Sequence, residues 1–455
     1  MNRYSGFRDF LDKSAQECPD QTAFVYESDG RHTFTYSQFH DAVYARAEAL
    51  KETHKTCIGI LSDGSYHCII EIFAASLAGM QIVMLDRMLP QALLGTLIQY
   101  TDVDCLYGSD LQKEKLNRFL TDGVKDGDGK ILFFTSGTTS QSKAVVLTDA
   151  SLMAAAWNGS TMLPIGTDDT LMCMLPLGHV FGFVCGLLWG LNCHASIALG
   201  RGPRHYLDDL SFFKPTVLSA VPLLLGFLIQ HDLLNEELKL ILVGAGDCPD
   251  AILDAVRMHG IHLSYGYGLT ETSSGVAIST SGDPRAMNVC PDDTITINED
   301  GEILIQADST MMLGYYKLPD DTKEVLKDGI LYTGDLGYYD NEGKLHLNGR
   351  KKEMLVMPNG TKIFLPEYEN QIRKVLNTEK ELAVVLHNSK PVLVVKDLKV
   401  KKEEVMNQLG DMMKNLPRGS QLTDIIELGH ELQKTATGKI KRWEIQKEIE
   451  NADKR

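Results

Sequence analysis

Paired cysteines and membrane-length hydrophobic runs are both missing from this sequence of 455 residues. Its nine cysteines form no Cys-x-x-Cys pair and no spacing typical of metal ligands, and the sequence shows no signal peptide. We therefore expect free thiols in a reducing, cytoplasmic compartment. The longest apolar stretch, residues 171–191, is broken by Pro176, by glycines and by His179. It predicts a strand, a loop and a buried helix, and no transmembrane segment.

Basic side chains are too few for a nucleic-acid-binding protein. The sequence holds 45 Lys and Arg against 61 Asp and Glu, a net charge of −16. Nucleic acid binding relies on Lys and Arg to neutralise phosphates, so no nucleic acid partner is expected. The shortage is uneven, because residues 351–455 hold 20 basic against 16 acidic side chains. A basic C-terminal part is consistent with a cap over anionic ligands, or simply with solvated helical faces.

Internal repeats and low-complexity tracts are also absent, and short apolar runs alternate with amphipathic segments over the first two thirds of the chain. The amphipathic runs at 68–79 and 251–260 predict helices. Strands are predicted at residues 81–85, 130–136, 170–176, 195–200, 216–222 and 238–246. Strands that alternate with helices indicate an α/β fold, in which parallel sheets are covered by helices on both faces.

The pattern changes near residue 290. Residues 294–306 alternate with period two around Asn-Glu-Asp-Gly, which predicts an antiparallel hairpin, and residues 343–350 predict another short strand. Because the chain is too long for one ordinary core, we predict two domains, residues 1–350 and 351–455. The second is expected to be a small α+β domain, with helices at 365–377, 400–415 and the C-terminus, and strands at 382–387 and 391–397.

A loop rich in hydroxyl groups follows the strand predicted at 130–136. The sequence FFTSGTTSQSKAVVLT, residues 133–148, places Gly137 among hydroxyl side chains and Lys143 a short distance beyond. Backbone freedom, hydroxyl donors and a nearby cation are what a phosphate-binding loop requires. The loop departs from the nucleotide pattern G-x-x-x-x-G-K-[ST], because Ser142 stands where the second glycine would be. The alternatives are a polyphosphate loop of another class and a polar surface turn.

A second motif, SYGYGLTET at 264–272, places an aromatic ring between two glycines. A tyrosine held by flexible backbone, here Tyr267 before Gly268, can stack on a purine. Thr270 can donate to a phosphate oxygen, and Glu271 can hold Mg²⁺, which prefers carboxylate and phosphate oxygens. The alternative is a glycine-rich turn followed by a helix N-cap, because Thr before Glu is a common helix start.

Three shorter motifs supply further charged groups. YTGD at 332–335 places Asp335 on a turn, where its carboxylate can accept hydrogen bonds from a ribose. NGRKKE supplies Arg350 just before the predicted boundary, and KTATGKIKR places Lys439 on a glycine turn, from which it can reach across a cleft. Each motif is a weak signal by itself, and Asp335 alone is equally consistent with a capped turn.

In their order along the chain, TSGTTSQSK, GYGLTET, YTGD, GRKKE and TGKIKR resemble the successive core motifs of the adenylate-forming, or AMP-binding, enzymes. Residues 311–345 resemble this family almost continuously, and the motifs are most similar to those of acyl-CoA synthetases and fatty acid–CoA ligases. The resemblance implies a large N-terminal domain of helix-sandwiched β-sheets plus a small β-barrel. A small, mobile α+β C-terminal domain would follow as a lid.

The resemblance also implies a reaction and a role for each matched residue. The reaction joins a carboxylate to ATP with release of pyrophosphate, then transfers the acyl group to a thiol, with Mg²⁺ as cofactor. The implied ATP-binding residues are Thr135, Ser136, Gly137, Thr138, Thr139 and Lys143 at the phosphates, Gly244, Ala245 and Gly246 along adenine, Tyr267 with Gly268 at the base, and Asp335 with Arg350 at the ribose. The remaining implied roles are α-phosphate contact by Thr270, Mg²⁺ binding by Glu271, catalysis by the ammonium of Lys439, and a hinge at Lys352.

The substrate class is indicated by residues 176–186, PLGHVFGFVCG, which contain no acidic residue. Relatives that activate amino acids carry an aspartate in this segment, whereas the segment here resembles that of acyl- and aryl-CoA synthetases. His179 would line the acid pocket; the alternative is a packed core histidine. We expect a fatty or aryl acid as substrate and CoA as acceptor. The alternatives are the phosphopantetheine of an acyl carrier protein, or a non-catalytic paralogue that binds nucleotide or acyl-adenylate.

Several positions depart from the family pattern. Ser140, Ser142 and Ala144 replace a glycine and the proline and glycine that flank the loop lysine, and Asp149 and Gln433 replace a histidine and a proline. Fewer glycines stiffen a loop, so slower turnover is expected. None of these departures removes a predicted ligand or the catalytic lysine.

Overall fold

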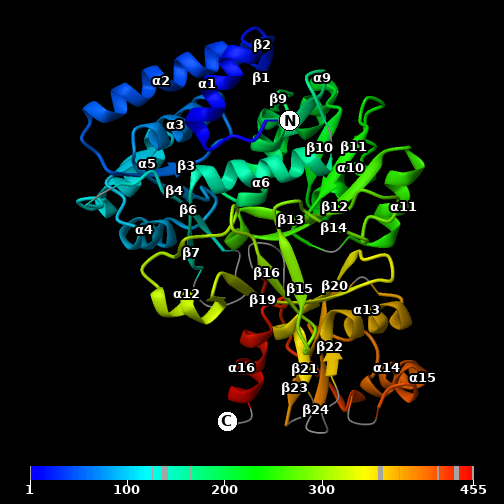
Figure 1. Ribbon diagram of the computed structural model, residues 1–455. Helices are drawn as coiled ribbons and strands as arrows, with labels where there is room; N and C mark the ends of the chain where they lie inside the picture. The colour runs from blue at the N-terminus through cyan, green and yellow to red at the C-terminus, as the bar shows by residue number, and fades with distance from the viewer. Residues whose placement is uncertain are drawn as a thin grey trace.

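The computed structural model describes residues 2–125, 127–135, 142–163, 165–246, 248–356, 362–378, 380–388, 390–417, 420–434 and 440–452. Five of the predicted site residues lie outside the described residues, namely Ser136, Gly137, Thr138, Thr139 and Lys439. Figure 1 shows helices and sheets in layers in the upper part of the view, with the C-terminal elements below them.

The larger of two central sheets has nine strands, in the order β14-β13-β12-β11-β10-β8-β9-β1-β2. Strands β12 to β1 of this order run parallel, and the outer pairs are antiparallel. The strands are β1 (Thr22–Glu27), β2 (Arg31–Thr35), β8 (Thr170–Cys173), β9 (Ser196–Leu199), β10 (Val217–Ala220), β11 (Leu240–Val243), β12 (His262–Leu269), β13 (Ser274–Ile278) and β14 (Asn288–Val289). The predicted strands at 170–176, 195–200, 216–222 and 238–246 are therefore confirmed.

The second central sheet has six strands, in the order β17-β7-β6-β4-β3-β5. Its strands are β3 (Cys57–Leu61), β4 (Gln81–Leu85), β5 (Cys105–Tyr107), β6 (Ile131–Phe134), β7 (Ala144–Leu147) and β17 (Gly314–Tyr315). β6 and β7 are antiparallel, so the hydroxyl-rich loop leaves and re-enters the sheet between neighbouring strands. β17 pairs with β7 and brings a distant part of the chain to the same edge.

Helices cover both central sheets (Figure 1). They are α1 (Phe7–Glu17), α2 (Tyr36–Glu52), α3 (Tyr66–Leu77), α4 (Gln91–Tyr100), α5 (Asp110–Leu116), α6 (Asp149–Met162), α7 (Val180–Phe183), α8 (Trp189–Asn192), α9 (Tyr206–Phe213), α10 (Pro222–Gln230) and α11 (Asp250–Met258). Thr148 begins α6 by accepting a hydrogen bond from the Ser151 backbone N–H at 3.0 Å. Asp149, where the family resemblance led us to expect histidine, accepts from the Phe7 N–H at 2.8 Å and so ties α1 to α6.

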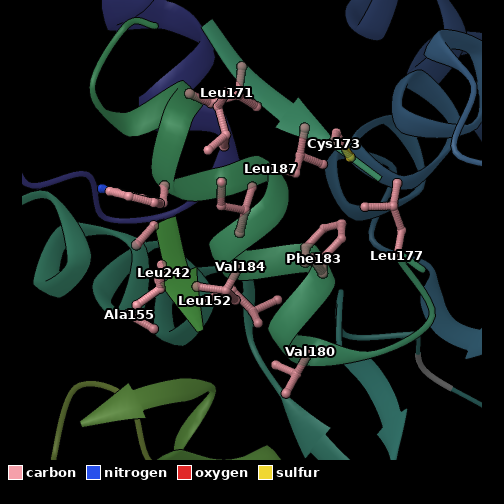
Figure 2. Close-up of a cluster of buried hydrophobic side chains, with 14 of the residues drawn as sticks. Leu152, Ala155, Leu171, Cys173, Leu177, Val180, Phe183, Val184, Leu187 and Leu242 are labelled. Atoms are coloured by element: carbon pink, nitrogen blue, oxygen red, sulfur yellow. The ribbon is translucent and has the colours of Figure 1, made fainter. Parts of the chain in front are cut away.

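The main hydrophobic core surrounds α6 and the segment predicted as strand, loop and buried helix. Figure 2 shows Leu152 and Ala155 of α6 among side chains of this segment, including Val184 and Leu187. The helical half consists of α7, a π-helical turn at Val184–Leu188, and α8. Ser219 donates to the Cys185 carbonyl of the π turn at 2.7 Å, which satisfies a backbone group that a regular helix would pair internally. Such turns are often found at functional sites.

A smaller antiparallel sheet follows, at the place of the expected small barrel. β15 (Thr294–Ile297), β16 (Glu302–Gln306), β19 (Ile330–Tyr339) and β18 (Leu326–Lys327) pair in that order, and β20 (Leu345–Arg350) pairs with β19. The short helix α12 (Pro319–Val325) precedes β18. The hairpin predicted at 294–306 is therefore confirmed as β15 and β16.

The C-terminal part begins after a 3₁₀ turn at Lys351–Glu353. Its elements are β21 (Met354–Val356), β22 (Lys362–Phe364), α13 (Leu365–Leu376), β23 (Leu382–His387), β24 (Lys390–Val395), α14 (Lys402–Gln408), α15 (Gly410–Lys414), β25 (Asp424–Glu427) and α16 (Arg442–Ala452). Two buried hydrophobic clusters here contain only residues from Ile363 onward. This separation supports the domains 1–350 and 351–455, whose boundary stays a prediction. Within the part of the chain described above, no helix combines the length and apolar character needed to cross a membrane.

Candidate active site

The two ends of the hydroxyl-rich loop are joined to each other at its base. The Thr135 N–H donates to the Lys143 carbonyl at 3.0 Å, and the Lys143 N–H donates to Thr135 Oγ1 at 3.2 Å. These reciprocal bonds continue the β6–β7 ladder by one residue pair. The predicted phosphate-binding residues Thr135 and Lys143 therefore lie side by side at the mouth of the loop.

Lys143 and Glu271 meet through a tyrosine of β17. The Lys143 ammonium lies 4.6 Å from the centre of the Tyr315 ring, and the Tyr315 hydroxyl donates to Glu271 Oε1 at 2.6 Å. Burial, and then the charge of Glu271, raise the pKa of Tyr315 above its ordinary value, so the phenol stays protonated as the donor. Lys143 also forms an ion pair with Asp321 Oδ2 at 2.6 Å. The predicted phosphate and magnesium residues thus share one location.

The segment that carries Thr270 and Glu271 is a 3₁₀ turn at Thr270–Thr272 and not a longer helix. Its N-cap is Leu269, whose backbone N–H donates to the Thr272 hydroxyl at 3.0 Å. Thr270 is not used as a cap, and among the described residues its hydroxyl has no hydrogen-bond partner. The turn is anchored to the β17 segment, because the Met312 N–H donates to the Glu271 carbonyl at 2.8 Å. Thr270 is therefore available to a ligand.

A second group of predicted residues meets around a buried carboxylate. The Tyr267 hydroxyl donates to Asp335 Oδ2 at 3.0 Å, and Arg350 Nε lies 2.9 Å from Asp335 Oδ1. Asp335 and Arg350 face each other across the β19–β20 ladder, which fixes this ion pair. Burial, and then the charge of Asp335, raise the pKa of Tyr267 well above its ordinary value. Asp335 is 6% exposed, so it is a fixed acceptor and more than the cap of a surface turn.

The predicted adenine segment lies next to Tyr267. Residues 244–246 follow β11, and the register that pairs Val243 with Tyr265 carries them alongside the next residues of β12. A Cβ on Gly244 would lie 2.7 Å from the Phe181 ring, so a larger residue there would have to displace that ring. Ala245 has φ +65°, and the β12–β13 register shifts between Tyr267 and Gly268. These irregularities turn the backbone at the carboxyl end of the sheet, where ligands of α/β proteins bind.

His179 lies at the start of α7, two residues before Phe181, whose ring lies close to Gly244. Its side chain is 44% exposed, which argues against the alternative of a packed core histidine. Its Nε2 lies 3.8 Å from Asp86 Oδ2, at the carboxyl end of β4. His179 therefore stands between the two central sheets, close to the predicted adenine segment.

Residues 11–131 and 121–316 match the profile described as AMP-binding enzyme. The chain belongs to the AMP-binding enzyme family. The family and the class of enzyme predicted from the ordered motifs are confirmed.

Relatives and solved structures extend this comparison over almost the full chain. The 2-succinylbenzoate–CoA ligase of Bacillus cytotoxicus is 25% identical, over 95% of this chain and 96% of the relative, and that of Oceanobacillus iheyensis is 26% identical, over 82% and 84%. The structure of O-succinylbenzoate coenzyme A synthetase (MenE) from Bacillus subtilis in complex with AMP superposes with a TM-score of 0.80 at 22% identity, covering 96% of this chain and 98% of that one. ATP-bound MatB from Rhodopseudomonas palustris gives 0.81 at 19% identity, covering 97% and 99%. These structures confirm the predicted fold class.

The predicted hinge residue of this AMP-binding enzyme lies between two side chains, Lys351 and Glu353, that form ion pairs with different parts of the chain. Lys351 Nζ lies 3.1 Å from Glu302 Oε2 and 3.2 Å from Asp300 Oδ2, and these acids raise its pKa. On the other side, Glu353 lies 3.9 Å from Arg442 at the start of α16. Lys352 is the residue between them, in the 3₁₀ turn. The hinge stays a prediction.

Three residues of the site were missed by sequence reasoning, namely Tyr315, Asp321 and Glu302. Glu302 is buried, and its Oε1 accepts from the Gly334 N–H at 3.0 Å, next to Asp335. Tyr315 and Asp321 lie within the 311–345 segment that resembles the family, which was the available signal. No group of three or more His, Cys, Asp or Glu in the described ranges can hold a metal alone. A magnesium ion at Glu271 would therefore need oxygen ligands from phosphates, as Mg²⁺ commonly does.

Proposed function

We propose that this enzyme activates a carboxylic acid with ATP and transfers the acyl group to a thiol, most favourably that of CoA. In the first step a carboxylate oxygen attacks the α-phosphorus, and pyrophosphate leaves. In the second step the thiol sulfur attacks the acyl carbon, and AMP leaves. The observation that carries the proposal is the meeting of separate motifs at one edge, where Tyr267, Asp335 and Arg350 adjoin the turn that holds Glu271.

Asp335 and Tyr267 would position the nucleoside. The Asp335 carboxylate, oriented by the Tyr267 hydroxyl and the Arg350 guanidinium, is an acceptor for the two ribose hydroxyls. Residues 244–246 and the Tyr267 segment would bracket the base. Because both flanking strands belong to the sheet, the nucleoside would meet a preformed surface and little ordering would be required.

Thr270, Lys143 and Glu271 would act on the phosphates. Thr270 would donate to the α-phosphate and Lys143 would pair with the terminal phosphates, while Glu271 would hold Mg²⁺. Bound there, the ion would supply charge neutralisation of the phosphate oxygens. The residues present fit this role, because the Glu271 carboxylate adjoins the lysine at the loop mouth through Tyr315.

Lys439 would complete the site from the C-terminal domain, although it lies outside the described residues. Attack of a carboxylate on a phosphate brings two anions together, and a positioned ammonium offsets their repulsion where charge develops. Rotation at Lys352 would then replace this lysine with a surface that receives the thiol. The basic excess of residues 351–455 suits the phosphates of CoA.

An aryl acid is the favoured substrate class. The predicted acid pocket segment, residues 176–186, lacks an acidic side chain for an amino group. The relatives reported above are named as ligases of an aryl acid, and a structure of the anthranilate CoA ligase AuaEII with anthranoyl-AMP superposes with a TM-score of 0.79 at 19% identity. These names favour the aryl over the fatty alternative. The cytoplasmic location stays a prediction, supported by nine cysteines that are all free.

The direct test is a panel of aryl, fatty and dicarboxylic acids scored by pyrophosphate release with ATP and Mg²⁺. An accepted acid is then offered CoA or a phosphopantetheinylated carrier protein, and thioester formation is measured. We expect release with at least one aryl acid and transfer to CoA. Nucleotide binding without pyrophosphate release for any acid would overturn the catalytic proposal, and exclusive transfer to the carrier would replace CoA as acceptor.

A further inference from the structure

Lys143 is already paired with a carboxylate of the chain itself. Its Nζ lies 2.6 Å from Asp321 Oδ2, and the ring of Tyr315 lies beneath it. Tyr315 and Asp321, the two partners of Lys143, are both held in place. Tyr315 pairs with Val145 of β7. The Tyr315 N–H also donates at 2.9 Å to the hydroxyl of Thr322, the neighbour of Asp321. The ion pair therefore belongs to a fixed framework of β17 and α12.

This pairing conflicts with the phosphate-binding role of Lys143. A lysine that binds phosphate uses its ammonium charge and its N–H donors for phosphate oxygens. A carboxylate at 2.6 Å occupies a donor and neutralises that charge. It would also repel a triphosphate brought to the same place. Asp321 and the terminal phosphates therefore compete for one cation.

We propose that Asp321 is a positioning residue that competes with the terminal phosphates of ATP for Lys143, an inference that rests on the proposed function. ATP binds by exchanging the Asp321 carboxylate for a phosphate oxygen, and the carboxylate takes the ammonium back when pyrophosphate leaves. Tyr315 retains its contacts with Lys143 and Glu271 during the exchange. Asp321 thus weakens the binding of ATP and of pyrophosphate, but not of AMP, which lacks the β- and γ-phosphates.

The test is the substitution Asp321→Asn, which removes the charge and keeps the side-chain shape. Because the ion pair is partly exposed, ATP and pyrophosphate should bind the variant about two- to fivefold more tightly, while AMP binding is unchanged. Calorimetric titration of the full chain with ATP and Mg²⁺, with pyrophosphate and Mg²⁺, and with AMP measures all three affinities without any acid. The matched control is Asp320→Asn, on the same turn of α12. Asp320 is exposed and has no side-chain partner among the described residues, so its removal should change none of the affinities.

The sign of the effect separates competition from a purely structural role. A carboxylate that only braced α12 would, once removed, weaken nucleotide binding or leave it unchanged. In a Lys143→Met background the tightening caused by Asp321→Asn should disappear, because the two residues act on one another. Unchanged or weaker ATP binding by the Asp321→Asn variant would overturn the inference. So would AMP binding that tightens as much as ATP binding in this variant, or ATP binding that tightens equally in Asp320→Asn. A wild-type chain that binds neither ATP nor AMP would overturn the proposed function and the inference with it.

Discussion

Ribose recognition by Asp335 gives the sharpest test of the nucleotide site. Its two oxygens are held by the Tyr267 hydroxyl at 3.0 Å and by Arg350 Nε at 2.9 Å. Asp335→Asn keeps the shape of the side chain, removes its charge and turns one acceptor oxygen into a donor. We expect this variant to lose its preference for a nucleotide that carries ribose hydroxyls.

The size of the effect follows from the charge of the acceptor. A hydrogen bond to a charged group contributes about 1.5–3 kcal/mol, which corresponds to about 10- to 150-fold in kcat/KM. The wild-type enzyme should prefer ATP to 2′,3′-dideoxy-ATP by this factor, and Asp335→Asn should show almost no preference. Pyrophosphate release with an accepted acid measures kcat/KM for both nucleotides, and calorimetry measures their binding.

Asp340 provides the matched control, because it is a carboxylate of the same β19–β20 hairpin. It accepts from the Lys344 N–H at 2.9 Å and lies 2.8 Å from His346 Nε2, so it acts only on the turn. Asp340→Asn should lower stability and keep the full preference for ATP. Asp335→Asn enzyme that still prefers ATP tenfold would refute the assignment of the ribose site.

Three further predictions concern the hinge, a buried acid and the catalytic cation. Glu302→Gln removes one of the charges that hold the Lys351 side chain. Trypsin cleavage after Lys351 or Lys352 should therefore accelerate about two- to fivefold. An unchanged cleavage rate would contradict the anchoring role of Glu302. Burial, and then Asp292, raise the pKa of Asp293 to about 7 from 3.8, so the folded state keeps a proton that the unfolded chain releases. Stability should therefore fall as the pH rises from about 4 to 7, by at most about 4 kcal/mol, and Asp293→Asn should flatten this decline in urea unfolding at pH 5 and pH 8. Lys439→Ala should lower adenylation at least about 100-fold, and pyrophosphate exchange near the wild-type rate would rule out its catalytic role.

Elements with a strong local period were predictable from sequence, and those that depend on distant partners were not. Buried parallel strands read as continuous apolar runs, which is why 81–85 and 216–222 correspond to β4 and β10. The charged helix predicted at 400–415 is divided into α14 and α15, and α15 begins at Gly410, a residue that weakens a helix interior. β25 was not predicted, because its four residues gain their structure from parallel pairing with β24.

The same distinction applies to the site. Thr135, Glu271 and Asp335 stood in recognisable motifs. The structure brings Thr135 beside Lys143 and Asp335 beside Arg350. Glu271 is linked to Lys143 only through Tyr315. The contacts of Tyr315 and Asp321 were missed, because they depend on β17, a strand of two residues that pairs with β7 across a long stretch of chain. No periodicity within two residues can signal such a pairing. Its position beside the loop became visible only in three dimensions.

The opposite anchoring of Lys351 and Glu353 has a mechanical consequence. Lys351 is bound to Asp300 and Glu302, while Glu353 faces Arg442. A torsional change confined to the one residue between them would turn α16 against the small sheet without breaking an ion pair on either side. These two anchors would then add nothing to the cost of reorientation, and a difference in ligand contacts between the two orientations would select one of them.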